Sequence, residues 1–369
     1  MTETKSPVIS FFLATSGHSG VDRYSKNLMF ALAEKGFKVE LLKIKNHGPY
    51  LKLFHKNLKV YELNTSHVYS SIFFLIKYLK NRQPQILLTD KERVNRTAIL
   101  AKLLSRSSTR LFVRMGTTIS VDLASRGCFD RWIQKVSIGK LYRFADRVIV
   151  SSKGVAEDMS EYTGLPKEHI EVVPCPVIDE AILSKTFPYP DHPWFKPDSP
   201  PVILSAGELC KRKDFSTLIK AFKIVKENID ARLVILGKGR LLNKLIKLTH
   251  ELEIDRYVDF PGFVENPYPY MAHANVFVLS SLWEGLGFVL IEALAVGTPV
   301  VSTDCPSGPS EILQNGKYGP LVPPKDHQKM AEAIIKVLKE PPPSDYLKKA
   351  VVPYLVNNAT ERYLKVFGF

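Results

Sequence analysis

Several features that would assign this sequence to a common class are scarce or missing. Its four cysteines are scattered, with no Cys-x-x-Cys pair and no metal-ligand spacing, which favours free thiols in a reducing compartment. No window approaches the roughly 18 consecutive apolar residues of a membrane-spanning helix. Residues 1–6 contain an acidic residue and lead into no sustained apolar stretch, so no signal peptide is expected. A cytoplasmic protein is predicted, with the inner face of the cell membrane as a further expected location.

Three motifs are also absent. The turn at Gly17–Gly20 is not the G-x-G-x-x-G fingerprint of dinucleotide-binding proteins, which disfavours a dehydrogenase. No Asp-x-Asp occurs, which fits a site without a metal, and no cofactor is expected. A basic nucleic-acid-binding protein, the alternative from another class, should interleave aromatic and basic residues on a known module, and none is visible.

What the sequence does contain is a globular composition with an uneven charge. Its 369 residues, 45% of them apolar, are comfortable for two domains. Residues 1–180 hold 28 Lys and Arg against 17 Asp and Glu, whereas the remainder holds 23 against 20. A basic first half suggests an acidic partner: nucleic acid, an anionic membrane or a phosphate-bearing acceptor. A solubilising surface is the alternative.

The most informative stretch is 280–303. The apolar run Val276–Ser280 predicts a buried strand, Phe288–Val296 predicts a helix, and Pro299–Thr303 predicts the next strand. The loop between the first strand and the helix would lie at the carboxyl edge of a parallel sheet, where open α/β sheets bind ligands.

Two glycines and two glutamates occupy this loop and helix. Gly285 and Gly287 would let the backbone approach a ligand, and the helix N-terminus offers N–H groups to phosphate or sugar oxygens. Glu292 could accept hydrogen bonds from a ribose diol, and Glu284 could hold hexose hydroxyls. Alternatively, Glu284 interacts with the helix dipole and Glu292 is solvated, although the apolar flanks argue against an exposed helix.

A basic loop follows the predicted strand Val202–Ala206. It runs from Gly207 to Lys213, ends in three consecutive cations and leads into a predicted helix over Asp214–Asn228. Cations at a strand-to-helix turn would stabilise a departing diphosphate. A solvated surface cluster is the alternative.

The run W-E-G-L-G-F-V-L-I-E-A-L-A-V-G-T-P-V-V at 283–301, continuing into residues 304–312, resembles the signature of the retaining glycosyltransferases of family 4. The resemblance covers nearly the whole chain. It implies an α/β protein of GT-B architecture, with two Rossmann-like domains facing across a cleft and a C-terminal helix returning to the first domain. It also implies transfer of a sugar from a nucleotide diphosphate donor with retention, by front-face attack in which the leaving phosphate takes the acceptor's proton.

The resemblance assigns roles to individual residues. Lys213 matches the family's phosphate-loop lysine, and Arg212 is expected to supply a second charge because Glu208 stands where Arg is common. Many relatives carry a histidine that contacts the sugar where this chain has Met115-Gly116. The backbone of the Gly116 loop or the carboxylate of Asp90 is the candidate substitute. Cys175, where relatives usually have Asn, is interpreted as a buried small residue.

The candidate site residues fall into three groups. Asp90 and its neighbours are included because they follow the predicted strand Ile86–Asp90, and a salt-bridged helix start is the alternative for them. The catalytic candidates are Glu284, Lys213, Arg212 and Asp90. The nucleotide-sugar candidates are Gly207, Gly262, Val264, Asn266, Gly285, Gly287, Phe288, Val289 and Glu292. The acceptor-side candidates are Gly17, Gly20, Arg23, Lys91, Arg93, Asn95 and Gly116.

The expected domains are 1–186 and 201–345, joined by a proline-rich linker at 187–200 and followed by a terminal helix at 346–369. The apolar stripe over Tyr69–Arg82, flanked by Lys77, Lys80 and Arg82, predicts either an interfacial helix or one that packs on its own sheet.

Together these features predict a peripheral enzyme that moves a sugar, with UDP as the favoured nucleotide, to a glycan or lipid-linked glycan in surface polysaccharide or glycolipid assembly. An epimerase or hydrolase acting on the same donor is the alternative. It would need catalytic groups that are sparse in the first half.

Overall fold

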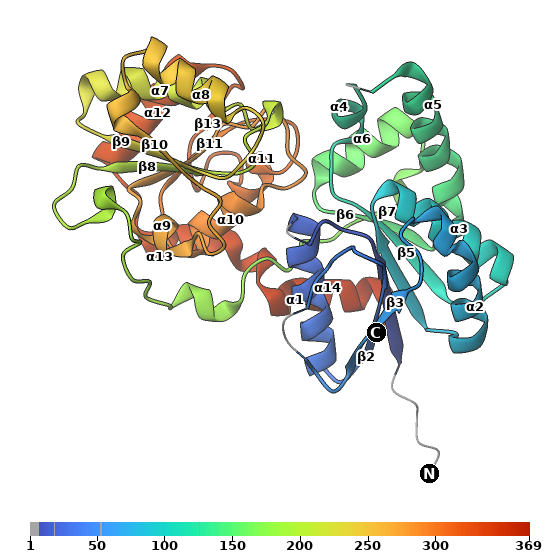
Figure 1. The fold of residues 1–369 in the computed structure, drawn as a ribbon. Helices are drawn as coiled ribbons and strands as arrows, with labels where there is room; N and C mark the ends of the chain where they lie inside the picture. Colours follow the sequence, from blue (N-terminus) through green and yellow to red (C-terminus); the bar gives the residue numbers. More distant parts are fainter. Residues whose placement is uncertain (1–6, 18, 52–53, 125) are drawn as a thin grey trace. The chain divides into compact units, whose positions relative to one another are not determined.

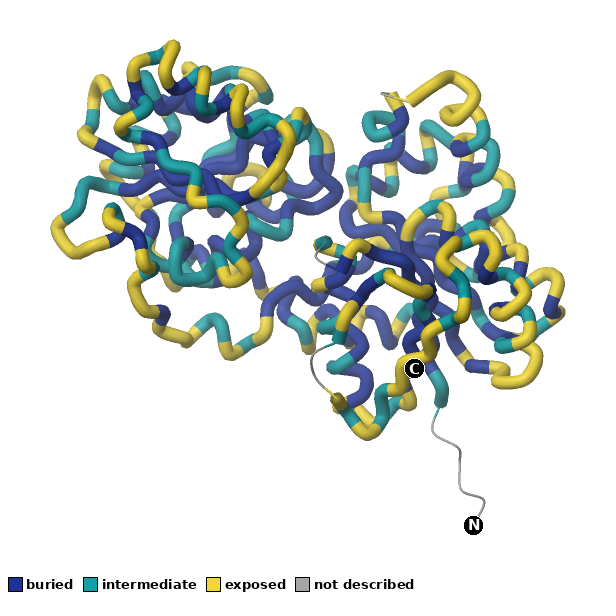
Figure 2. Tube along the Cα trace, viewed as in Figure 1, coloured by how far each residue is buried: buried dark blue, intermediate teal, exposed yellow. Residues whose placement is uncertain are grey.

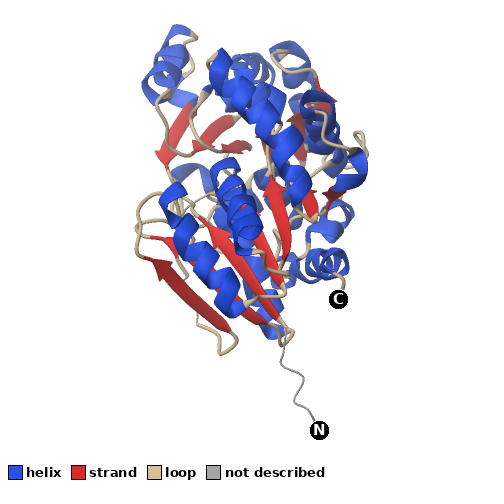
Figure 3. Ribbon diagram, turned by 90° about the vertical axis from the view of Figure 1, so that its right-hand side faces the viewer, coloured by secondary structure: helices blue, strands red, loops and turns tan. Residues whose placement is uncertain are grey.

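The computed structural model describes residues 7–17, 19–51, 54–124 and 126–369, which form two compact units (Figures 1 and 2). Unit 1 comprises Met1–Val177 and Val356–Phe369, and unit 2 comprises Ile178–Leu355. Each unit is a parallel sheet covered by helices (Figure 3). The segment 1–6, on which the absence of a signal peptide was expected, lies outside the described residues, as does His18 of the first glycine loop.

Unit 1 contains a seven-stranded parallel sheet in the order β3-β2-β1-β4-β5-β6-β7. Its strands are β1 (Val8–Leu13), β2 (Lys38–Ile44), β3 (Leu58–Leu63), β4 (Ile86–Asp90), β5 (Arg110–Met115), β6 (Arg147–Val150) and β7 (Ile170–Val172). Its helices are α1 (Gly20–Glu34), α2 (Ile72–Arg82), α3 (Glu92–Ser105), α4 (Ile119–Ala124), α5 (Cys128–Val136), α6 (Lys153–Thr163) and α14 (Val356–Phe367).

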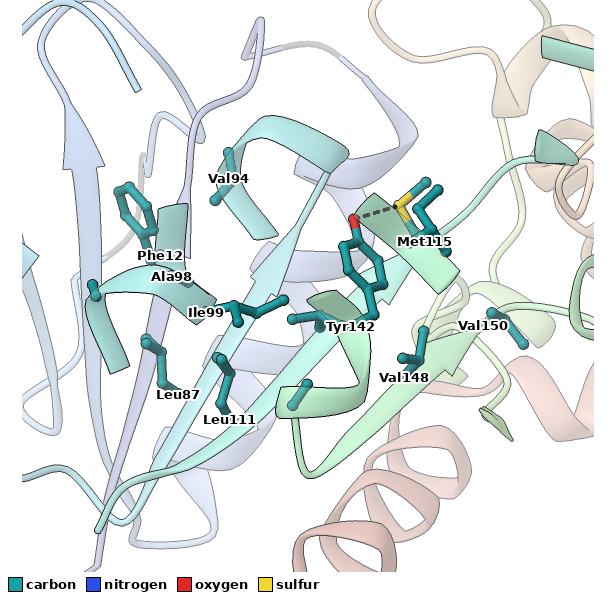
Figure 4. Packing of buried hydrophobic residues seen from close by; sticks show 14 of the residues in the cluster. Phe12, Leu87, Val94, Ala98, Ile99, Leu111, Met115, Tyr142, Val148 and Val150 are labelled. Carbon is teal, nitrogen blue, oxygen red and sulfur yellow. Dashed lines mark hydrogen bonds between the residues drawn. The ribbon is translucent and has the colours of Figure 1, made fainter. Parts of the chain in front are cut away.

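The two faces of this sheet bury separate cores because successive side chains of a strand point to opposite sides. Phe11 of β1 packs in the core formed with α1 and α14, whereas its neighbour Phe12 packs in the core formed with α2, α3 and α6. Figure 4 shows the second core, where Phe12 and Leu87 from the strands lie near Ala98 and Ile99 of α3. A strand buried on both faces must be apolar at nearly every position, which explains the run Val8–Leu13.

Unit 2 contains a six-stranded parallel sheet in the order β10-β9-β8-β11-β12-β13. Its strands are β8 (Val202–Ala206), β9 (Arg232–Leu236), β10 (Val258–Gly262), β11 (Val276–Leu279), β12 (Val300–Thr303) and β13 (Leu321–Val322). Its helices are α7 (Phe215–Asn228), α8 (Leu242–Glu251), α9 (Tyr268–His273), α10 (Phe288–Ala295), α11 (Pro309–Ile312), α12 (His327–Lys339) and α13 (Ser344–Lys348). α7 contacts α8 and α12, whereas α10 contacts α9 and α13.

Both sheets reverse their winding direction next to their first strand. In unit 2 the chain runs from β8 outward to β9 and β10, then returns to place β11 on the other side of β8. In unit 1 the same reversal puts β4 beside β1. The carboxyl ends of two such neighbouring strands form the switch point of the sheet, which is where open α/β sheets bind ligands. In unit 2 the loops at this point are the basic loop after β8 and the Glu284 loop after β11.

The proline-rich segment 187–200, expected to be a linker, belongs to unit 2. Its aromatic side chains explain the difference. Phe187 stacks on Tyr268 with ring centroids 5.6 Å apart, and the buried Phe195 contacts Tyr270 edge-on at 5.2 Å. Prolines end helices and strands, but they do not prevent a segment from burying its aromatic rings. The change of unit occurs earlier, between Val177 and Ile178.

The terminal helix expected at 346–369 is three segments: the end of α13, a 3-10 stretch over Lys349–Tyr354 and then α14. Pro353 interrupts the pattern because its ring removes a backbone N–H and disfavours the helical conformation of the residue before it. Only α14 belongs to unit 1, where Phe367 packs on Phe112 with ring centroids 4.8 Å apart. Residues 346–355 belong to unit 2.

Candidate functional site

The centre of the candidate site is an ion-pair cluster where the loops after β8 and β11 meet. The Nζ of Lys213 donates to Oε1 of Glu284 at 2.6 Å, and Nη1 of Arg212 donates to Oε2 at 2.8 Å. The hydroxyl of Ser281 donates to Oε1 at 2.7 Å. Lys213 and Glu284 are 7% and 4% exposed, so water screens their interaction only weakly. Sequence reasoning named the three charged residues separately, and the fold brings them into contact.

Backbone hydrogen bonds hold these two loops together. Lys211–Lys213 forms a single 3-10 turn, η7. The amide of Leu282 donates to the carbonyl of Arg212 at 2.7 Å, and the Ser280 hydroxyl donates to the carbonyl of Lys213 at 2.7 Å. The cations and the carboxylate are therefore fixed relative to one another by main-chain contacts as well as by their charges.

The charges in the cluster shift the pKa values of Glu284 and Arg212. Burial alone would raise the pKa of Glu284, but the nearby charges of Lys213 and Arg212 outweigh it and hold that pKa below its ordinary value. Burial acts in the opposite sense on Arg212, and the Glu284 carboxylate overcomes it, so the pKa of Arg212 is raised. The cluster combines two basic side chains with one carboxylate, which gives it an excess of positive charge.

Glycine is required at two positions around the cluster. A Cβ on Gly207 would lie 3.0 Å from Cε of Lys213, because the lysine side chain runs directly over this residue. Gly287 precedes α10 with a φ of +95°, a conformation that a side chain disfavours. From this turn the chain enters α10, whose first residues are Phe288 and Val289. The first amides of a helix have no acceptor inside it and are available to an anion.

The remaining nucleotide-sugar candidates lie around the same edge of the sheet. Glu292 is fully buried in α10, so the alternative that it is solvated is wrong. Gly262 ends β10, and its carbonyl accepts from the amide of Gly237 at 2.7 Å, which ties this strand end to β9. Beyond it Val264 is half-buried, and the exposed Asn266 accepts from the amide of Tyr268 through Oδ1 at 3.2 Å.

Asp90 is not an open catalytic carboxylate, which corrects the expectation from sequence. Its Oδ2 accepts from Nη1 of Arg114 at 2.6 Å and from the hydroxyl of Tyr24 at 2.7 Å. The side chains of Asp90 and Arg114 are 3% and 2% exposed. The same guanidinium donates to Sγ of Cys175 at 2.9 Å. Asp90 therefore neutralises a buried arginine within unit 1.

Asn95 is corrected for a similar reason. It is fully buried, and its amide group donates to the carbonyl of Arg114 at 2.9 Å and to the hydroxyl of Tyr142 at 3.1 Å. The side chain of Met115 also points into this core, where Tyr142 donates to its sulfur at 3.7 Å (Figure 4). Asn95 thus fixes the start of α3 to β5 and has no side-chain atom to offer an acceptor.

Cys175 is buried, as expected. Burial raises the pKa of its thiol above the ordinary value, so the thiol is protonated at neutral pH and is a poor nucleophile. Its place beside Arg114 makes it part of the interior of unit 1.

The other acceptor-side candidates are still available at the surface of unit 1. Arg23, Lys91, Arg93, Gly20 and Gly116 are exposed, whereas Gly17 lies beneath the ring of Tyr50. Each exposed position follows a strand or opens a helix at the carboxyl edge of the sheet. A cationic surface beside this edge is therefore retained after Asp90 and Asn95 are removed from the site.

Sequence reasoning missed two residues that organise these regions. Ser281 orients Glu284, and the spacing Ser-x-x-Glu ahead of a helix was an available signal. Arg114 lies among apolar residues in the fully buried part of β5, 111–115, and an arginine in a buried strand requires a buried partner. That requirement pointed to Asp90 at the end of the adjacent strand β4.

Two further observations bear on the chemistry. Within the described residues, no three His, Cys, Asp and Glu side chains group closely enough to hold a metal ion, and a metal-independent site stays a prediction. In the same residues no helix is long and apolar enough to cross a membrane.

Two units, each built on a parallel sheet with helices on its faces, have the architecture of the GT-B class of glycosyltransferases. The solved lipopolysaccharide outer core galactosyltransferase WaaB shares this fold with a TM-score of 0.77 and 19% identity, over 98% of this chain and 99% of that one. Anabaena Alr3699/HepE in complex with UDP matches with a TM-score of 0.80 and 15% identity, over 98% and 99%.

Sequence comparison places the chain in a family. Residues 18–181 match Glycosyltransferase Family 4, and residues 191–351 match Glycosyl transferases group 1. The chain is 33% identical over 258 residues to N-acetylgalactosamine-N,N'-diacetylbacillosaminyl-diphospho-undecaprenol 4-alpha-N-acetylgalactosaminyltransferase of Campylobacter jejuni, covering 70% of this chain and 67% of that protein. It belongs to the family 4 glycosyltransferases, as the resemblance indicated.

The buried pair in unit 1 predicts a large stability effect. Asp90→Ala leaves the Arg114 guanidinium buried without a carboxylate and should lower the free energy of unfolding by about 3–5 kcal/mol. Glu361→Ala, which breaks the exposed pair with Lys35, should cost less than about 1 kcal/mol. Urea unfolding at neutral pH measures both. An Asp90→Ala variant as stable as the wild type would contradict the structural role.

The lowered pKa of Glu284 predicts a pH-dependent stability. The contribution of this carboxylate is present above its ordinary value of 4.5 and is lost as the pH falls through the lower folded-state value. The stability difference between wild type and Glu284→Gln should therefore be constant near neutral pH and shrink below about pH 4.5. Urea unfolding across a pH series checks this, with the exposed Glu227→Gln as control. A stability difference between wild type and Glu284→Gln that persists unchanged into strong acid would refute the stabilising role of the ionised Glu284 carboxylate.

Proposed function

We propose that this chain is a retaining glycosyltransferase that moves a sugar from a UDP-sugar to a lipid-linked glycan acceptor. The single observation that carries the proposal is the Lys213–Glu284–Arg212 cluster at the switch point of unit 2. The relatives support the substrates: one solved neighbour contains UDP, and the Campylobacter relative is named for an undecaprenol-linked acceptor.

The cluster suits the departure of a nucleoside diphosphate. Breaking the bond between the sugar and the β-phosphate leaves negative charge on the phosphate oxygens, and preorganised cations lower the energy of that state. Lys213 has three donor hydrogens and Arg212 has five, of which Glu284 engages one on each group. The others are proposed to reach the diphosphate, together with the first amides of α10.

Glu284 is proposed to position these cations and to hold sugar hydroxyls. An ionised carboxylate whose two oxygens already accept from Lys213, Arg212 and Ser281 is a weak nucleophile. This favours front-face attack, in which the acceptor oxygen approaches from the side of the leaving group and passes its proton to the phosphate. The configuration at the anomeric carbon would then be retained without a covalent glycosyl-enzyme and without a metal.

The other candidates divide between the two substrates. Glu292 is proposed to accept from the ribose hydroxyls, and the 262–266 loop to contact the base. In unit 1 the exposed Gly20, Arg23, Lys91, Arg93 and Gly116 are proposed to contact the acceptor. Asp90 and Asn95 have no part in this proposal.

We further propose that unit 1 contacts an anionic membrane through the surface of α2 and α3, which pack on each other. This surface exposes large aromatic and aliphatic side chains, which are unusual on a helix surface that contacts only water. They are Tyr69, Phe73 and Phe74 beside and on α2, and Leu100, Leu103 and Leu104 on α3. Lys77 and Lys80 are exposed beside them, whereas Arg82 is held by the buried Glu40 at 2.5 Å and is removed from the proposed contact. Exposed apolar groups flanked by lysines suit a membrane interface.

Lys213→Ala should impair turnover far more than Lys211→Ala, the neighbouring residue of the same turn. Loss of a preorganised cation should remove about 2–4 kcal/mol of transition-state stabilisation. Loss of a surface lysine should remove less than about 0.5 kcal/mol. The measurement is UDP release from a panel of UDP-sugars, with and without lipid-linked glycan acceptors. NMR of the product tests retention at the anomeric carbon.

Thermal shift with UDP, GDP and ADP provides the accompanying control, because a ligand of the folded state raises the melting temperature. UDP should stabilise the wild type more than Lys213→Ala. Equal, small effects of both lysine variants on turnover, with no stabilisation by any nucleotide, would refute the proposed donor site.

Membrane contact predicts salt-sensitive binding to anionic vesicles. Each basic residue near an anionic surface is worth about 1 kcal/mol, so Lys77→Glu/Lys80→Glu should weaken co-sedimentation at low salt by at least about tenfold. Lys336→Glu/Lys339→Glu makes the same charge change on two exposed lysines of α12 in unit 2 and serves as control. Binding should decline as salt shortens the Debye length. If the wild type ignores anionic vesicles at low salt, α2 only packs on its sheet and the acceptor is soluble.

A further inference from the structure

Unit 2 contains a strongly basic hollow that the proposed donor site does not use. It has a volume of about 580 Å³ and lies where α7, α8 and α12 begin. Its wall includes six basic side chains: Lys211, Lys220, Arg240, Lys244, Lys325 and His327. None of the residues proposed to bind the nucleotide sugar lines it. A volume of this size is within the range of small-molecule sites.

These cations have no carboxylate partners. Within the described part of the chain, none of the six lies within 4.0 Å of an Asp or Glu oxygen. The acid in the wall, Asp214, accepts from the hydroxyl of Thr217 at 2.7 Å. One turn further along α7 and α8 the pattern is different, because Lys223 pairs with Glu227 and Lys247 with Glu251, each at 3.6 Å. Positive charge is therefore left unneutralised at the hollow, whereas one turn further along α7 and α8 it is paired.

The N-terminus of α8 adds to this excess. α8 has 10 residues and neither a side-chain cap nor an acidic residue in its first turn, whereas α7 begins directly after Asp214, an acid at its N-cap position. The N-terminus of a helix carries partial positive charge and is stabilised by acids, so a lysine there is unfavourable. Lys244 is nevertheless the third residue of α8. An anion in the hollow would neutralise the lysines and satisfy the uncapped amides together.

We propose that this hollow binds a soluble small molecule carrying two or more phosphate groups, as a site separate from the sugar-nucleotide site. The number of unpaired cations favours more than one phosphate, because near neutral pH a single phosphate group carries only about two charges. The cations line the wall of a hollow, which suits a small ligand better than the headgroups of a flat membrane.

The single turn η7 separates the two sites and contacts both. Lys211 lines the hollow, and Lys213, two residues later, contacts Glu284. Leu282 also lines the hollow, and its amide donates to the carbonyl of Arg212. A ligand in the hollow would therefore touch the same turn that holds the proposed phosphate-binding cations.

The test is calorimetry of the full-length chain with tripolyphosphate as the probe. Lys213→Ala is used as the background, so that the sugar-nucleotide site contributes little. In that background Lys220→Gln/Lys244→Gln should weaken tripolyphosphate binding by about tenfold to a hundredfold, the loss expected for charged hydrogen bonds. Lys223→Gln/Lys247→Gln removes the same charge from the same helices and should leave affinity within about twofold.

Other outcomes overturn the proposal. Equal weakening by both double variants would mean that only overall charge matters. Loss of all binding in Lys213→Ala alone would place the tripolyphosphate in the sugar-nucleotide site. If Lys220→Gln/Lys244→Gln abolishes co-sedimentation with anionic vesicles but leaves tripolyphosphate binding intact, the cations bind a lipid surface instead.

The ligand-free variants provide a check on folding. Lys220→Gln/Lys244→Gln removes repulsive charges and should melt at or above the wild-type temperature. Lys223→Gln/Lys247→Gln loses two ion pairs and should not be stabilised. A marked drop in the melting temperature of Lys220→Gln/Lys244→Gln would show that these lysines stabilise the fold itself. It would overturn the proposal that their role is to bind a ligand.

Discussion

The carboxylate of Glu284 accepts hydrogen bonds from two cations, Lys213 and Arg212. This contact depends on the order of the strands in unit 2. The carboxylate follows β11, the cations follow β8, and the two strands are neighbours only because the chain reverses its winding after β10. A buried lysine is costly without a counter-charge, and the Glu284 carboxylate supplies that counter-charge to Lys213 in a largely water-excluded position. Because one carboxylate faces two cations, the cluster keeps a net positive charge. That excess charge is what a diphosphate can use.

Unit 1 has the same topology but a different chemical arrangement at the corresponding place. Asp90 ends β4, next to β1, as Glu284 follows β11 next to β8. There a single carboxylate faces a single guanidinium, and the pair is closed over by Tyr24, whose ring lies 3.9 Å from the guanidinium carbon of Arg114. The charges cancel within the interior, and α14 packs beside them. This switch point is thus sealed, and the polar groups of unit 1 that remain available are on its surface loops.

Uncompensated positive charge therefore gathers in three separate places with different surroundings. The Glu284 cluster is small and buried, the hollow at the starts of α7, α8 and α12 is larger and open, and the α2–α3 surface mixes lysines with exposed apolar groups. These differences suit a diphosphate, a soluble polyphosphate and a membrane, respectively. All three would bind phosphate groups, which the proposed donor and the proposed lipid-linked acceptor both carry.

The sequence alone determined much of this protein, because local patterns carry local structure. Apolar runs placed β8 and β11 to within a residue, the apolar pattern of 288–296 placed α10, and the 283–301 signature indicated the family. Lys213, Arg212 and Glu284 were each predicted for the site. Their mutual contact depended on strand order, which no local pattern contains.

Only the tertiary structure decided which polar residues are open to a ligand. Asp90 and Asn95 follow a strand just as site residues do, but Arg114 and Tyr142 come from distant parts of the chain and take up their hydrogen bonds. The prolines of 187–200 suggested a linker until Phe187 and Phe195 were seen to pack on unit 2. The unpaired lysines of the hollow are spread from residue 211 to residue 325, and only folding gathers them. Burial and charge pairing depend on which residues are neighbours in space, and the order of residues along the chain does not specify those neighbours.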